Sequence, residues 1–226
     1  MLTNHKDIKA WLDRMNIKNY TINATGTVTV DGNVNIIHKG LTKIPVQFRI
    51  VYGYFSCSNN SLKSLNGSPR EVGGNFHCWH NSLTTLEGSP QEVAGKFSCY
   101  NNSLESLEGS PLEVGGDFYC YYNSLKSLNG SPREIGGDFD CGNNRLKSLN
   151  GSPREIGGNF YCGANGLKSL KGSPQNVGGD FYCSNNSLES LNGSPQEVTG
   201  NFYCQRNHFK TSPNCDTIIN GELFWK

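Results

Sequence analysis

The stretch Ser61–Asn81, which reads SLKSLNGSPREVGGNFHCWHN, decides the fold of this chain. Its pattern returns at intervals of 21 residues and occurs seven times, down to Asn207. Degenerate copies precede it over residues 41–60 and, more faintly, around residues 34–36. A fixed period of this length is the signature of a solenoid, in which every coil stacks on its neighbours. The sequence therefore predicts one elongated repeat domain of about nine coils.

Five positions of the unit stay apolar in all seven copies, which predicts that they point into the solenoid. In the first copy they are Leu62, Leu65, Val72, Phe76 and Cys78. Phe76 and Cys78 are two residues apart, so a strand would place both side chains on one face. Five such side chains contribute about 1.5–3 kcal/mol each. Ordering the coil costs about 1–2 kcal/mol per residue, so a single repeat is expected to be unfolded until it is stacked.

Turn residues and asparagines recur at fixed places between these apolar positions. Gly67-Ser68-Pro69 predicts a turn. The second glycine of the pair Gly73-Gly74 is kept in every copy, which indicates a positive φ or a bare Cα at that position. An asparagine stands three residues after every repeat cysteine, from Asn60 to Asn207. Stacked asparagines of this kind are expected to bond the backbone of a turn that has no strand partner.

The pattern F-x-C-x-x-N-x-L, as in residues 76–83, resembles the leucine-rich-repeat signature L-x-L-x-x-N-x-L. The resemblance covers residues 41–209 and implies a repeat solenoid with a parallel β-sheet whose outer face is concave. The 21-residue period, the Phe/Cys pair in place of leucines, and Val72 one residue early depart from that family. A plain parallel β-helix is therefore the alternative fold. The units are also similar to repeat proteins of unknown function from large tailed bacteriophages, which implies a phage origin.

Both ends of the chain carry cap signals, which an open solenoid needs. Asn4 followed by Asp7 resembles a capping box, and Ile8, Trp11, Leu12 and Met15 then follow at helical spacing. At the other end, Asn220-Gly221 between two apolar runs predicts a β-hairpin. The predicted organisation is an N-terminal amphipathic helix and cap over 1–26, degenerate first coils over 27–60, seven repeats over 61–209 and a C-terminal hairpin cap over 210–226.

Composition narrows the classes of function. Lys+Arg 20 against Asp+Glu 19 gives a net charge of +1, which argues against nucleic acid or an anionic membrane surface as the partner. No apolar run approaches the ~20 residues of a membrane span. The first fifteen residues lack the apolar core of a secretory signal, so we expect a cytoplasmic protein, in the bacterial host cytoplasm if the chain is phage-encoded.

The residues do not form a recognisable catalytic or metal-binding motif, and we expect no cofactor. The eight repeat cysteines are expected to form a reduced internal ladder, because coils stack about 4.8 Å apart and a small thiol packs as an apolar group. His77-Cys78-His80 is the only local Cys/His cluster, and strand alternation places His77 and Cys78 on opposite faces. Most polar groups recur in rows, whereas an active site needs unlike groups that converge. The sequence therefore predicts a protein that is not an enzyme.

The outward positions of the Phe–Cys strand vary from copy to copy, while the core positions do not. They are rich in Tyr, with Trp and Asp, and such aromatic side chains dominate binding hot spots. The predicted partner-binding residues are His77, Trp79, Tyr100, Asp117, Tyr119, Tyr121, Tyr122, Asp138, Asp140, Tyr161 and Tyr182. A row of stacked tyrosines also favours a β-sheet for structural reasons alone, so for Tyr161 and Tyr182 both interpretations stay open.

These features together predict a non-enzymatic repeat protein that binds another protein through a Tyr/Trp/Asp-rich sheet face. The phage resemblance implies an inhibitor or modulator of a bacterial host protein, such as a defence protein. One alternative is a protein that sequesters a small molecule, a nucleotide or a sugar, between aromatic rows. A second alternative is a structural component of the virion.

Overall fold

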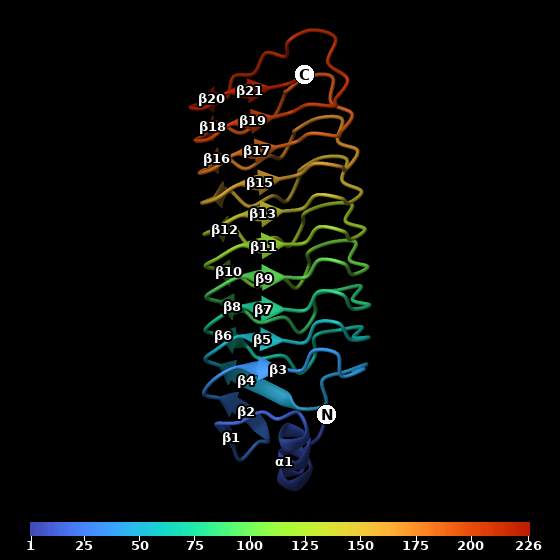
Figure 1. Cartoon of the computed structure of the whole chain (residues 1–226), viewed down its shortest axis with the longest axis vertical. Helices are drawn as coiled ribbons and strands as arrows, with labels where there is room; N and C mark the ends of the chain where they lie inside the picture. The colour runs from blue at the N-terminus through green and yellow to red at the C-terminus, as the bar shows by residue number, and fades with distance from the viewer.

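The computed structural model describes residues 1–226, which form a straight column of stacked coils (Figure 1). Each coil contributes one short strand to each of two sheets, and both sheets run the length of the column. The first sheet has eleven strands: β1 (Tyr20–Ile22), β2 (Thr27–Val30), β4 (Gln47–Val51), β6 (Glu71–Val72), β8 (Glu92–Val93), β10 (Glu113–Val114), β12 (Glu134–Ile135), β14 (Glu155–Ile156), β16 (Asn176–Val177), β18 (Glu197–Val198) and β20 (Ile218–Ile219).

The second sheet has ten strands, and nine steps of 21 residues separate the start of its first strand from the start of its last. They are β3 (Val34–Asn35), β5 (Phe55–Ser56), β7 (Phe76–His77), β9 (Phe97–Ser98), β11 (Phe118–Tyr119), β13 (Phe139–Asp140), β15 (Phe160–Tyr161), β17 (Phe181–Tyr182), β19 (Phe202–Tyr203) and β21 (Leu223–Phe224). All pairings are parallel except that of β1 with β2. Through the repeats, each residue pairs with its equivalent 21 positions later, as Phe76 does with Phe97.

Two parallel sheets in a straight column correspond to the alternative fold expected from the sequence, the parallel β-helix. Val72 lies one residue early for a leucine-rich repeat because it belongs to a separate strand of the first sheet. The pair Gly73-Gly74 then turns the chain into the second sheet. The outer face of that sheet runs straight along the column (Figure 1), so the concave arc implied by the leucine-rich-repeat resemblance is absent.

The inward positions predicted from the repeat are confirmed. Leu62, Leu65, Phe76 and Cys78 are fully buried, as are their equivalents in the later copies, apart from Leu191 at 1%. The phenylalanine rings form a continuous internal row with centroids 4.7–5.6 Å apart from β5 to β19. All eight repeat cysteines are free thiols in the same core, so the predicted cysteine ladder is present.

The second glycine of each pair is required by close backbone contact and not by a positive φ. A Cβ on Gly74 would lie 3.0 Å from the carbonyl carbon of Gly53 in the preceding coil. The positive φ values belong instead to the glycine of the Gly-Ser-Pro turn, for example +85° at Gly88. Coil-to-coil approach therefore excludes a side chain at the corner.

The repeated asparagine bonds the turn backbone, as predicted. Asn81 Nδ2 donates to the carbonyl oxygens of Cys78 in its own coil and Cys57 in the preceding coil, both at 3.1 Å. Its Oδ1 accepts the Leu62 backbone N–H at 2.9 Å. Every coil from Asn60 to Asn207 repeats this bridge. It replaces strand pairing where the chain leaves the second sheet.

The N-terminal cap is a helix, as the sequence predicts. Helix α1 (His5–Arg14) begins after Asn4, whose side chain accepts the Lys6 backbone N–H. Ile8, Trp11 and Leu12 are buried against the first coil. The helix covers the N-terminal end of the column in Figure 1, and the chain has no helix long and apolar enough to cross a bilayer.

The predicted C-terminal hairpin is wrong. β20 pairs with β18 in the first sheet and β21 pairs with β19 in the second, so the two strands do not pair with each other. The physical reason is register: Gly221 stands 21 residues after Gly200 and occupies the same corner between the sheets. Residues 210–226 therefore complete one more coil, even though the Gly-Ser-Pro turn of the repeat is missing from it.

Candidate functional site

The outer face of the second sheet consists of two rows of side chains that the repeat leaves free to vary. One row lies between the Phe and Cys positions, and the other follows the cysteine. Because Phe and Cys point inward, strand alternation turns the first row outward. The large outward side chains are partly exposed, whereas Ser56, Ser58 and Ser98 on the same rows are buried. The exposed part of this face therefore begins at the coil of His77 and Trp79.

An aromatic stack occupies the N-terminal half of this face. The Trp79 and Tyr100 rings lie 5.5 Å apart and 5° from parallel, and Tyr100 stacks on Tyr121 at 4.5 Å. Tyr119 lies 6.1 Å from Tyr121 in a tilted arrangement, and Tyr122 contacts Tyr121 edge-on at 5.6 Å. The rings are therefore held in place by contacts with one another. We call these five residues the N-terminal aromatic cluster.

A second stack occupies the C-terminal half. Tyr161, Tyr182, Tyr203 and Phe224 stack at 4.6, 4.5 and 4.9 Å, all within 10° of parallel. We call these four residues the C-terminal stack. All neighbouring rings of this stack are nearly parallel, whereas the N-terminal aromatic cluster also contains tilted and edge-on rings. Only the rings at its two ends have a face without an aromatic neighbour.

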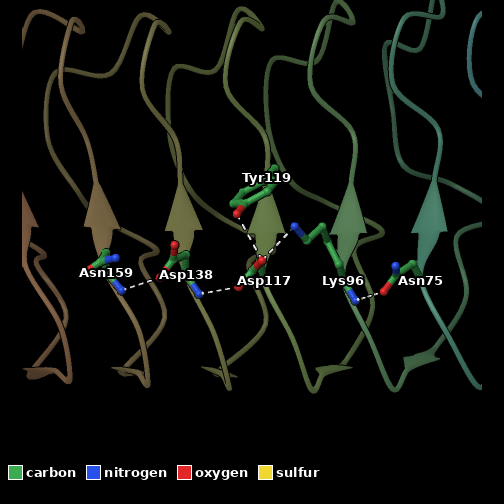
Figure 2. A network of polar contacts seen from close by, with 6 residues as sticks. All are labelled: Asn75, Lys96, Asp117, Tyr119, Asp138 and Asn159. Atoms are coloured by element: carbon green, nitrogen blue, oxygen red, sulfur yellow. Dashed lines mark hydrogen bonds and ion pairs between the residues drawn. The ribbon is translucent and has the colours of Figure 1, made fainter.

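A row of Asn and Asp residues lies beside these stacks, one residue before each Phe. Figure 2 shows that each side chain reaches the backbone of the next coil: Asp117 Oδ1 accepts the Asp138 N–H at 2.9 Å, and Asp138 Oδ1 accepts the Asn159 N–H at 2.7 Å. Asn75 and Asp180 do the same for the residues 21 positions on. Sequence reasoning placed this row on the binding face and missed its structural role. The signal was present, because Asn or Asp recurs there in six of the eight coils from Tyr54 to Asn201.

Asp117 also anchors one part of the face by electrostatics. Lys96 Nζ lies 2.9 Å from Asp117 Oδ2 and 4.5 Å from the centre of the Tyr119 ring. The Tyr119 hydroxyl donates to the same carboxylate oxygen at 3.1 Å (Figure 2). Burial, followed by the hydrogen bond to Asp117, raises the pKa of the Tyr119 phenol. The Lys96 ammonium group is therefore held between the Asp117 carboxylate and the Tyr119 ring.

Asp140 has no such cation. Its Oδ1 accepts the Gly142 backbone N–H at 2.8 Å, and no Lys, Arg or His nitrogen forms an ion pair with it. Burial, with a smaller contribution from the charge of Asp138, raises the pKa of the Asp140 carboxyl to about 6. Gly142 and Gly163 stand on the neighbouring row at this level, so no ring covers the position. The face is interrupted here by a carboxylate between its two aromatic regions.

Two further predicted residues differ in their surroundings. His77 is half-buried, and burial lowers the pKa of its imidazole, whose Nδ1 has no hydrogen-bond partner. Tyr122 is 54% exposed and has a φ of +50°. The structure thus gathers Trp79, Tyr100, Tyr119, Tyr121 and Tyr122 into one cluster and places Tyr161 and Tyr182 in a separate stack.

The cysteine ladder offers no reactive thiol at this face. Burial raises the pKa of the Cys57 and Cys204 thiols to about 12, and it raises those of the ladder cysteines between them. No group of three or more His, Cys, Asp or Glu side chains is arranged to hold a metal ion.

A groove of about 940 Å³ lies on the first sheet, with the valines and corner glycines of successive coils in its lining and the exposed Tyr52 and Leu112 among its residues. Five glutamates of the first sheet also line it: Glu71, Glu92, Glu113, Glu134 and Glu155. Comparisons of the chain with protein-family models, with curated proteins and with solved structures find no match.

Proposed function

We propose that this chain is a non-enzymatic binding protein whose outer face of the second sheet holds another protein. The observation that carries the proposal is the N-terminal aromatic cluster, in which Trp79, Tyr100 and Tyr121 stack and Tyr119 and Tyr122 flank them. Sheet propensity alone does not require unlike residues at equivalent positions. Ordered Trp and Tyr side chains bury a large area at low entropic cost when they bind.

The geometry of the face supports a macromolecular partner over a small molecule. Neighbouring rings in both aromatic regions already stack at 4.5–5.5 Å, so a base or sugar ring has no gap to enter within them. A ligand pocket normally encloses most of its ligand, whereas this face runs straight along the column (Figure 1). A flat aromatic strip is suited to an interface of about 800 Å² per partner.

The proposed partner is a protein of a bacterial host. This step rests on the resemblance of the repeat units to phage proteins of unknown function, and it makes the chain an inhibitor or modulator of a host protein. Binding alone is sufficient for such a role, because a protein seated on a host factor can block it sterically.

Affinity capture from bacterial lysate, read by mass spectrometry, tests the proposal. The variant Trp79→Ser/Tyr119→Ser/Tyr121→Ser removes the centre of the cluster from outward positions and should keep the fold, which circular dichroism checks. The matched control Tyr52→Ser/Leu112→Ser removes two exposed apolar side chains from the first sheet, 61% and 71% exposed. We expect a stoichiometric protein with the wild type and the control and its loss with the triple variant. A partner that the triple variant retains would refute this face as the binding site.

A further inference from the structure

The C-terminal stack ends at Tyr161 with one ring face that has no aromatic neighbour. Its rings follow one another from Phe224 to Tyr161 at 4.5–4.9 Å. The next residue of the row, paired in register with Tyr161, is Asp140. A flat group placed on that ring face would therefore extend the stack and meet a carboxylate.

Asp140 has glycines beside it in the neighbouring row, and a second carboxylate, Asp138, stands two residues before it. Gly142 and Gly163 give the neighbouring row no side chain at this level. Asp138 and Asp140 each use one oxygen to accept a backbone N–H, from Asn159 and Gly142 respectively. No hydrogen bond or ion pair engages the second oxygen of either carboxylate. We call the position over the Tyr161 ring, between Asp138 and Asp140, the acidic notch.

Two coils earlier, the equivalent position of the repeat holds a lysine. Lys96 stands 23 residues before Tyr119, lies over its ring at 4.5 Å and pairs with Asp117. The residue that stands 23 before Tyr161 is Asp138. The chain therefore supplies its own cation over Tyr119. At the equivalent repeat position before Tyr161 it has an aspartate instead of a lysine.

We propose that the acidic notch binds the guanidinium group of an arginine side chain presented by the protein partner. The planar guanidinium would stack on Tyr161 and donate to the free oxygens of Asp138 and Asp140. Arginine fits better than lysine because its flat cation can stack on a ring and present several N–H donors in one plane. This inference rests on the proposed function, since it names the chemistry that the partner must bring.

The charge state of the region agrees with this assignment. Asp138 and Asp140 contribute to the raised pKa of the Tyr161 phenol, whose largest cause is burial. A desolvated carboxylate without a cation is destabilising in the free protein and is common at binding sites. An incoming guanidinium would satisfy it.

The test is an NMR titration of the free protein with N-acetyl-arginine methylamide, read from the amide signals of Gly142 and Gly163. The matching lysine and citrulline compounds separate planarity from charge. We expect saturable changes in amide chemical shift with the arginine compound. The lysine compound should bind at least about fivefold more weakly, and the citrulline compound should give no response. Absence of saturation up to about 100 mM arginine compound, or equal binding of lysine, would overturn the proposal.

Variants localise the response. Asp140→Asn and Tyr161→Ser should each weaken arginine binding about tenfold, a loss of about 1.4 kcal/mol. Tyr161→Phe keeps the ring and should bind as the wild type does, and Tyr203→Ser is the control within the same stack. Unchanged binding in Asp140→Asn would refute the notch. If Asp140→Asn still captures the partner from lysate, the protein-binding face stands and the notch fails. If no partner is captured but arginine binds in an Asp140-dependent way, the notch stands alone.

Discussion

At the scale of a single residue, Asp140 is a carboxyl group whose charged form is disfavoured by burial. Its pKa is raised from 3.8 to about 6, mainly by burial. The folded state therefore favours the protonated form of Asp140. The contribution of this group to the free energy of unfolding is greatest below about pH 4 and is lost as the pH rises through about 6. One pKa unit corresponds to about 1.4 kcal/mol.

Asp140→Asn should therefore stabilise the protein at about pH 7.5, by no more than about 3 kcal/mol, and have little effect near pH 4. The amide keeps an oxygen that can accept the Gly142 N–H. Urea denaturation at the two pH values measures the difference, with Glu113→Gln on the first sheet as the charge-matched control. Equal effects at both pH values would contradict the assignment. Lost binding with gained stability would identify Asp140 as a functional residue retained at a cost.

Ala164 occupies a strained backbone position that the sequence did not reveal. The second residue after each repeat cysteine has a φ of 50–58°, at Asn59, His80, Asn101, Tyr122, Asn143, Ala164, Asn185 and Arg206. Asparagine tolerates this left-handed conformation better than alanine does. Ala164→Asn is expected to raise the free energy of unfolding by about 0.5–1 kcal/mol. Thermal or urea denaturation checks it, and destabilisation would argue against the left-handed geometry.

At the scale of an element, the asparagine row holds the turns together. Asn144 Nδ2 donates to the carbonyl oxygens of Cys120, Cys141 and Gly142, and its Oδ1 accepts the Leu125 N–H. Asn144→Ala should cost about 2–4 kcal/mol, because several buried backbone groups lose their partner. Asn129→Ala, at an exposed turn position, is the matched control and should cost little. Similar losses in both variants, measured by urea denaturation, would refute the role of the row.

Strong periodicity made much of this fold predictable, and its failures have local causes. The inward Leu, Phe and Cys positions follow directly from their invariance between Ser61 and Asn207. The hairpin prediction failed because Asn220-Gly221 has the local chemistry of a tight turn, while its register with Thr199-Gly200 places it at the corner between sheets. Whether the two strands that flank a turn pair with each other depends on their register with the strands of the preceding coil.

The candidate site was predictable in its residues and less so in its grouping. Variation among copies identified the outer rows. The identity of a residue at one position does not show toward which neighbour its Tyr or Trp ring is oriented. Tyr100 stacks on Tyr121, whereas Asp140 stands between Tyr119 and Tyr161 in their row and separates Tyr161 from the cluster. The anchoring of Asp117 by Lys96 joins residues from adjacent coils, which periodicity places close together without fixing the contact.

At the scale of the whole molecule, the solenoid protects its cysteines as a unit. The eight repeat cysteines are buried, whereas Cys215 is partly exposed. Alkylation requires an accessible thiolate, so iodoacetamide should modify Cys215 alone in the native protein and all nine cysteines after denaturation. Mass spectrometry counts the adducts, and Cys215→Ser should remain unmodified under native conditions. Labelling of several cysteines in the native protein would contradict the closed core.

For the whole molecule, the proposed function requires that the outer face of the second sheet bind a protein. Site-specific photo-cross-linking in bacterial cells tests it most directly, with the cross-linking residue placed at Tyr121 on that face or at Leu112 on the first sheet. A protein-binding face predicts one discrete cross-linked protein from position 121 and none from position 112. Cross-linking from position 112 alone, or no adduct from position 121, would contradict the claim.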